Sequence, residues 1–230
     1  MSTMELPGLD RLLEVVSKHG VPIEILPASR ITPRAGDTLY GLPVDPLLAG
    51  AYSRFGKLVL GRLGLGPWLL LPGDEEKSGL VLENEEWQGY FPHMFWPEHF
   101  RALMLFGSDM RYRFATVPEL ANSEGRQPVV FLDPYEEIYA LPIASDVNRF
   151  FDTFSRYVEV MVEDPDYQAG GAPGVGFPYD APELIAQDTP LLGMIKEGRF
   201  DRLMYERDKT GWRDERAIAS TREWISRLVQ

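Results

Sequence analysis

Cysteine is absent from the 230-residue sequence, and histidine occurs only three times. Without cysteine, the chain forms no disulfide, binds no metal through thiolates and has no cysteine nucleophile. This absence suits the reducing cytoplasm, where we expect the protein to be located. The first five residues, MSTME, show no basic region ahead of an apolar core, so we expect no signal peptide.

Positive charge and long apolar runs are also scarce. The formal net charge is −12 and the sequence pI is about 4.8. Nucleic-acid binding needs a basic footprint and anionic membranes repel an acidic surface, so we expect neither a nucleic acid nor a membrane as partner. No stretch approaches the roughly 20 apolar residues of a membrane-spanning helix. An acidic surface either keeps a protein soluble or attracts a basic protein partner.

The three histidines give no catalytic or metal-binding pattern. His19 falls at the end of an expected helix, where an imidazolium is favoured by the helix dipole. His93 and His99 lie in an aromatic-rich segment, and their spacing with Glu98 fits no known set of metal ligands. We therefore expect no metal site and no cofactor.

Acidic residues at expected turns are the remaining candidates for catalysis. They include Asp109, Asp133, Glu136 and Glu137, and turns favour aspartate for local hydrogen bonding. A hydrolase would need two of these carboxylates to converge in a pocket. The glycines of residues 61–66 lead into a strand and lack the lysine and serine of a phosphate-binding loop. We expect the protein not to be an enzyme.

Four short apolar runs with turn residues between them predict an antiparallel meander. The runs are residues 103–106, 112–116, 129–132 and 138–141. A helix follows, because six apolar residues repeat at three- and four-residue spacing and share one face: Val147, Phe150, Phe151, Phe154, Val158 and Met161. This face is wide enough to cover a sheet. The predicted class is α+β, with a mostly antiparallel sheet flanked by helices.

The rest of the chain adds elements on both sides of this unit. Before it we predict a helix that carries the stripe Leu9 to Val16 and ends just before Gly20, and a second helix with Asp45 as its N-cap that ends at Gly56 or Gly61. We also predict an edge strand over 23–26 and strands over 68–71 and 79–82. An irregular aromatic segment follows as far as Phe100. After Val162 a glycine-rich linker over 170–176 precedes helices that begin near Thr189 and Asp214. We predict one domain over 1–164, with 165–230 a linker and helical extension packed on it.

This order of elements resembles the SUKH superfamily, which includes fungal cell-wall-synthesis regulators and bacterial toxin-immunity proteins. The likeness covers about residues 9–163 and is carried by these segments: Leu42-Pro43-Val44-Asp45 leading into 48–56, Trp68-Leu69-Leu70-Leu71-Pro72, Leu105-Phe106-Gly107-Ser108-Asp109, 128–133, and Phe150-Phe151-Asp152-Thr153-Phe154 followed by Tyr157-Val158. The chain departs from the family pattern at Met110-Arg111, where a run of glycines is usual, and at Asp146-Val147.

The resemblance implies an α+β fold and function by protein binding. It implies an immunity protein that binds and neutralises a cognate bacterial toxin, often a nuclease and here expected to be basic. The alternative is a SUKH-like regulatory or scaffold protein whose helices after residue 176 recruit a cellular partner. The sequence sets no oligomeric state.

Acidic residues beside aromatic ones are the candidate partner-binding sites. Carboxylates around aromatic anchors suit a basic protein surface, although a solvated hairpin explains the same pattern. The first patch comprises Asp74, Glu75, Glu76, Glu83, Glu85, Glu86, Trp87 and Tyr90. The second comprises Tyr135, Glu136 and Glu137.

Overall fold

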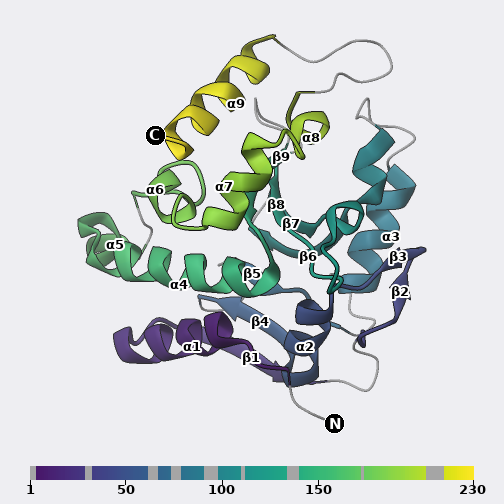
Figure 1. The fold of residues 1–230 in the computed structure, drawn as a ribbon. Helices are drawn as coiled ribbons and strands as arrows, with labels where there is room; N and C mark the ends of the chain where they lie inside the picture. The colour runs from purple at the N-terminus through teal and green to yellow at the C-terminus, as the bar shows by residue number, and fades with distance from the viewer. Residues whose placement is uncertain are drawn as a thin grey trace.

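A seven-stranded antiparallel sheet runs through the computed structural model, with helices around it (Figure 1). The strand order is β1-β4-β5-β6-β7-β8-β9. The strands are, in chain order, β1 (Ile23–Pro27), β4 (Phe55–Leu60), β5 (Trp68–Leu70), β6 (Met104–Asp109), β7 (Tyr112–Thr116), β8 (Val129–Leu132) and β9 (Ala140–Ala144). The structure describes residues 4–28, 33–61, 67–73, 79–90, 98–109, 112–133, 140–171, 174–205 and 215–230. The predicted α+β class is confirmed.

The predicted meander forms the β6–β9 half of the sheet. Its register places Leu105 opposite Ala115, Ala115 opposite Val130, and Phe131 opposite Leu141. One turn was placed wrongly, because residues 107–109 continue β6 rather than end it. A Cβ on Gly107 would lie 2.6 Å from the backbone oxygen of Trp68, so glycine here allows close strand contact rather than a turn. Ile138 and Tyr139, in the fourth predicted run, lie outside the described residues.

Helix α4 (Val147–Glu163) supplies the aromatic cover that the sequence predicts. Its N-cap, Asp146, accepts a hydrogen bond from the backbone nitrogen of Arg149 at 2.8 Å. All six apolar residues of the predicted face are buried. The Phe150 ring lies 5.5 Å from Phe106 on β6 and 5.0 Å from Phe114 on β7, measured between ring centroids. The helix therefore packs onto the meander.

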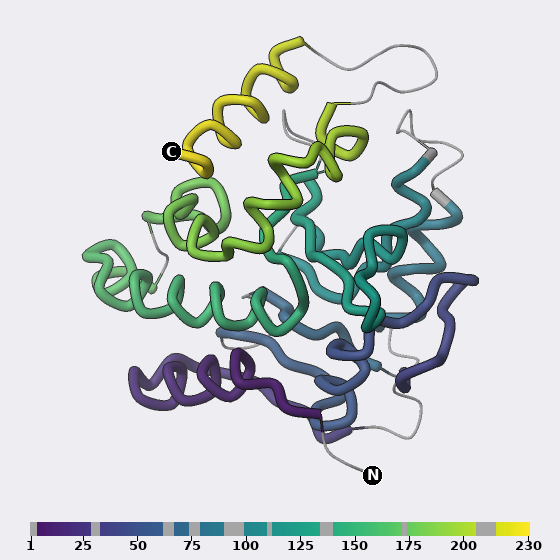
Figure 2. Tube along the Cα trace, in the orientation of Figure 1, coloured from purple at the N-terminus to yellow at the C-terminus, as the bar shows by residue number. Residues whose placement is uncertain are grey.

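Helix α1 (Pro7–His19) lies alongside α4 and runs in the same direction (Figure 2). It ends at Gly20, whose φ of 65° places it in the left-handed region, and His19 occupies the last turn as predicted. Gly8 fixes the contact with α4, because its backbone nitrogen donates to Asn148 Oδ1 at 2.8 Å.

Helix α2 (Pro46–Arg54) begins as predicted, with Asp45 accepting from the backbone nitrogen of Leu48. Its predicted end was wrong, because Phe55 already belongs to β4. Strand β4 follows the helix directly, without a turn that would mark the boundary. It pairs with β1 and β5 and is buried from Gly56 onward. A small hairpin, β2 (Thr38–Leu39) and β3 (Leu42–Pro43), precedes α2.

Helix α3 (Leu80–Tyr90) replaces the strand predicted over 79–82 and the irregular chain predicted from Trp87. Its inward positions are Leu80, Asn84 and Trp87, all buried, at helical spacing. The helical pattern of apolar residues is interrupted at Asn84, because this polar residue occupies a buried position. Its amide donates to the backbone oxygen of Leu105 at 2.8 Å and accepts from the backbone nitrogen of Leu105 at 3.0 Å, which binds α3 to β6. A 3-10 helix, η2 (Glu98–Ala102), leads into β6.

The C-terminal third is helical and shares the hydrophobic core. Its helices are α5 (Pro165–Gly170), α6 (Pro182–Ile185), α7 (Thr189–Lys196), α8 (Asp201–Tyr205) and α9 (Glu215–Leu228). Helices α7 and α8 contact β9, and α9 contacts α6 and α8. Phe177 and Phe200 are buried in the same core as Phe150. The helices expected near Thr189 and Asp214 are present, and the domain division at 164/165 stays a prediction. No helix in the described ranges is long and apolar enough to cross a membrane.

Candidate functional site

The first predicted binding patch is partly described, and the second is not. Asp74, Glu75 and Glu76 lie outside the described residues, as do Tyr135, Glu136 and Glu137. Tyr90 ends α3, but its side chain is outside the described part. The structure therefore places Glu83, Glu85, Glu86 and Trp87, all on α3.

These four residues of α3 differ in their surroundings. Glu85 and Glu86 are exposed. Glu83 is half-buried and pairs with Arg113 at 3.1 Å. Trp87 is only 9% exposed, and its indole nitrogen donates to the backbone oxygen of Phe100 at 3.0 Å. Trp87 is thus a core residue, so the aromatic anchor of this surface must come from elsewhere.

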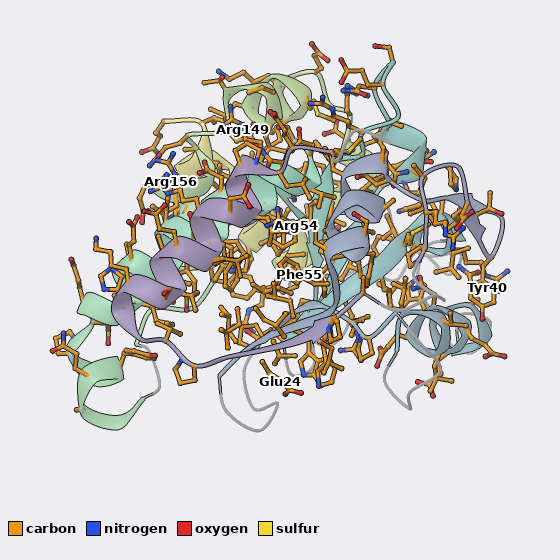
Figure 3. All side chains as sticks on the ribbon, turned by 90° about the horizontal axis from the view of Figure 1, so that it is seen from below. Glu24, Tyr40, Arg54, Phe55, Arg149 and Arg156 are labelled. Atoms are coloured by element: carbon orange, nitrogen blue, oxygen red, sulfur yellow. The ribbon has the colours of Figure 1, made fainter. Side chains whose placement is uncertain are left out.

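Tyr40 provides an exposed aromatic ring beside α3, and the sequence reasoning missed it. It lies in the turn between β2 and β3 with a φ of 50°, followed by Gly41 with a φ of 79°. The side chain is 46% exposed, and its hydroxyl donates to the backbone oxygen of Val81 at 3.4 Å. Partial burial and the nearby Glu85 carboxylate raise the pKa of Tyr40. Tyr40, Glu85 and Glu86 together are called the α3 acidic face below; Tyr40 is labelled in Figure 3.

A second surface is a groove of about 830 Å³. Two of its lining residues, Arg149 and Arg156, lie on the left in Figure 3, and Tyr40 lies on the right. The groove lies where the first turns of α1 and α4 meet α7 and the chain after η3 (Pro118–Leu120). Its charged lining residues are Arg11, Arg126, Asp146, Arg149, Asp152, Arg156 and Arg199. This surface, with five arginines and two aspartates, is called the arginine groove below.

Asp152 is the centre of the arginine groove. Its carboxylate lies 3.2 Å from Arg11, 3.2 Å from Arg156 and 3.8 Å from Arg149. Arg11 comes from α1, whereas Arg149 and Arg156 share a face of α4 with Asp152. Arg11 also pairs with Glu159, so two carboxylates serve three guanidinium groups and one positive charge is left over. No sequence pattern indicated Arg149 or Arg156 as site residues.

Two carboxylic acids with a raised pKa, Asp45 and Asp109, could suggest acid–base chemistry, but neither lines the groove. Burial raises the pKa of Asp45 to about 6 from its usual 3.8, although backbone hydrogen bonds from Leu48 and Gln127 oppose the shift. Burial also raises the pKa of Asp109 at the end of β6. Asp133, at the end of β8, accepts a hydrogen bond from the Tyr179 hydroxyl at 2.8 Å. Asp45 is structural: its two oxygens cap α2 and hold Gln127 at 2.6 Å.

The raised pKa of Asp45 predicts a distinctive pH dependence. The folded chain keeps the Asp45 proton up to about pH 6, whereas the unfolded chain releases it near its usual pKa. Raising the pH through this window therefore removes stability from the wild type. We expect the destabilisation caused by Asp45→Asn to shrink by up to about 3 kcal/mol between pH 4 and pH 7. Urea unfolding of the wild type and of the Asp45→Asn variant from pH 4 to pH 7 measures this effect. A difference in the free energy of unfolding that stays constant with pH would contradict the expectation.

In the described ranges, no three histidine, aspartate or glutamate side chains are grouped so that they could hold a metal ion. The described residues form two charged surfaces, one acidic with an exposed tyrosine and one rich in arginine. No family model, no curated protein and no solved structure matches this chain.

Proposed function

We propose that the protein is a non-enzymatic binding module that neutralises a basic bacterial toxin through the α3 acidic face. The observation that carries the proposal is Tyr40, an exposed ring in a hairpin turn beside two exposed glutamates of α3. A tyrosine supplies large contact area at low entropic cost, which is why it is common among residues that dominate binding energy. The SUKH resemblance supports the toxin as the kind of partner.

The charges of α3 favour a basic partner. The helix has three glutamates and no basic residue, and only Glu83 among the three forms an ion pair with a described side chain. Glu85 and Glu86 are therefore available to speed association with a positively charged surface. The β2–β3 hairpin holds Tyr40 beside α3, so a partner bound to the glutamates of α3 would also cover the Tyr40 ring.

The regulatory alternative has less support. It requires the helices after residue 176 to recruit a cellular partner. The apolar residues of these helices, including Leu191 and Trp224, already belong to the core. Their apolar faces are thus occupied by the rest of the chain.

Calorimetric titration against the proteins encoded beside this gene tests the proposal. We expect tight binding to a toxic domain that weakens as salt is raised. Tyr40→Ala should weaken this binding about 30-fold, because it removes the central anchor. The double variant Glu85→Gln, Glu86→Gln should mainly flatten the salt dependence.

Val160→Ala is the matched control. Val160 is 41% exposed on α4, away from α3, so its truncation should leave the affinity unchanged. Equal affinity of the Tyr40→Ala variant and the wild type would show that the partner binds elsewhere. Absence of binding to every neighbouring gene product would reject the toxin as partner.

A further inference from the structure

The arginine groove concentrates positive charge in an acidic protein. Five of the 23 lysine and arginine residues line it, although the chain as a whole carries a net charge of −12. Among the lining residues the two aspartates leave an excess of three positive charges. Glu159 and Glu124, which pair with Arg11 and Arg126 from outside the lining, reduce this excess to one. Holding like charges together costs free energy unless a counter-charge is present, so the groove is suited to an anion.

The guanidinium groups keep donors available for such a ligand. Arg149 is 50% exposed and approaches Asp152 only to 3.8 Å. Arg199 forms no ion pair with any side chain that the structure describes, and donates to the backbone oxygen of Leu120 at 3.2 Å. Arg126 is 43% exposed and pairs with Glu124 at 2.7 Å, outside the groove lining. Since each guanidinium has five N–H donors, these contacts leave several unused.

The fold holds these groups in place from different directions. Arg11 is tied to Asp152 and to Glu159, the latter at 3.0 Å, so it is fixed between α1 and α4. Arg156 is tied to Asp152 and hydrogen-bonded to Gln187. The first turns of α1 and α4 also face the groove, and their dipoles add positive potential to that of the arginines.

We propose that the arginine groove binds a small polyanion that carries at least two phosphate groups. Guanidinium forks match phosphate oxygens in bidentate pairs, and the unused N–H donors of Arg149 and Arg199 come from two separate side chains, which suits a ligand with two phosphates. The volume of about 830 Å³ is that of a small-molecule site. The described lining residues include no aromatic ring on which a base could stack, and the acidic protein repels a long nucleic acid. These features favour a compact ligand.

Titration of the full chain with pyrophosphate at low ionic strength is the test, with citrate as a comparison of similar charge. We expect pyrophosphate to bind at least ten times more tightly than citrate. Arg149→Gln and, separately, Arg199→Gln should each weaken pyrophosphate binding about tenfold or more, since each removes charge-assisted hydrogen bonds. Arg149 is the better first variant, because Asp152 keeps Arg11 and Arg156 as partners.

Arg54→Gln is the matched control. It removes the same charge outside the groove, where Arg54 pairs with Asp10 at 2.6 Å. Its pyrophosphate affinity should stay within twofold of the wild type. Equal binding of citrate and pyrophosphate, an equal loss in Arg54→Gln, or no binding at millimolar pyrophosphate would each overturn the proposal. If a single-stranded oligonucleotide bound more tightly than pyrophosphate, the proposal of a small ligand would be wrong. The arginine groove and the α3 acidic face are separate surfaces, so these outcomes are independent of the proposed toxin binding.

Discussion

Phe114→Ala is expected to lower the free energy of unfolding by about 3–5 kcal/mol. Phe114 is 1% exposed on β7, at the centre of an aromatic cluster. Its ring contacts five others, with centroid distances of 6.5 Å to Phe106, 5.8 Å to Phe131, 5.0 Å to Phe150, 6.3 Å to Phe154 and 6.5 Å to Phe177. Truncation removes the apolar burial and leaves a cavity that five neighbours cannot all move to fill.

Thermal unfolding followed by calorimetry measures this effect, and the expected fall in Tm is about 10 °C. Val160→Ala is the control: Val160 is exposed on α4, so this substitution should change the free energy of unfolding by less than about 0.5 kcal/mol.

The same experiment also tests the predicted domain division between residues 164 and 165. Because Phe177 packs against Phe114, Phe154 and Tyr157, we expect one transition that shifts as a whole. Two transitions, with only the first lowered, would instead favour two separable units.

Local sequence patterns predicted the elements whose ends are marked by capping or turn residues. Helix α4 could be predicted because its apolar residues repeat without interruption and Asp146 caps its start. The meander could be predicted because polar residues separate its runs. Strand β4 was missed because no turn residue separates it from α2, so Phe55 extended the helical pattern by one residue. Helix α3 was missed because Asn84 takes a buried position that the pattern reserves for an apolar residue.

The two surfaces differ in how far sequence could find them. Glu83, Glu85 and Glu86 are neighbours in sequence, so their acidic character was visible, but Tyr40 joins them only through the placement of the β2–β3 hairpin. The arginine groove has no local signal. Its arginines lie between Arg11 and Arg199, in segments that only tertiary packing brings together. The net charge of −12 also gave no sign of the groove, because the sum of all charges does not show where the positively charged residues lie.

Gly8→Ala is expected to destabilise the protein by about 3 kcal/mol, which corresponds to a fall in Tm of roughly 6–12 °C. A Cβ at this position would lie 2.1 Å from the backbone oxygen of Asn148 and 2.9 Å from the backbone nitrogen of Asp152. Both atoms belong to the backbone of α4, so no side-chain rotation can relieve the clash. Helix α1 must instead move away from α4, which breaks the hydrogen bond from Gly8 to Asn148.

Gly89→Ala separates this clash from the general effect of replacing a glycine in a helix. Gly89 lies on α3, and a Cβ there would meet no described atom within 4 Å. Alanine should therefore be neutral or stabilise by up to about 1 kcal/mol. The same displacement of α1 would carry Arg11 away from Asp152, so Gly8→Ala should also weaken pyrophosphate binding if Arg11 helps to form the groove. A Gly8→Ala protein as stable as Gly89→Ala would mean that the two helices are not held at this distance, and the arginine groove would lose the contact that shapes it.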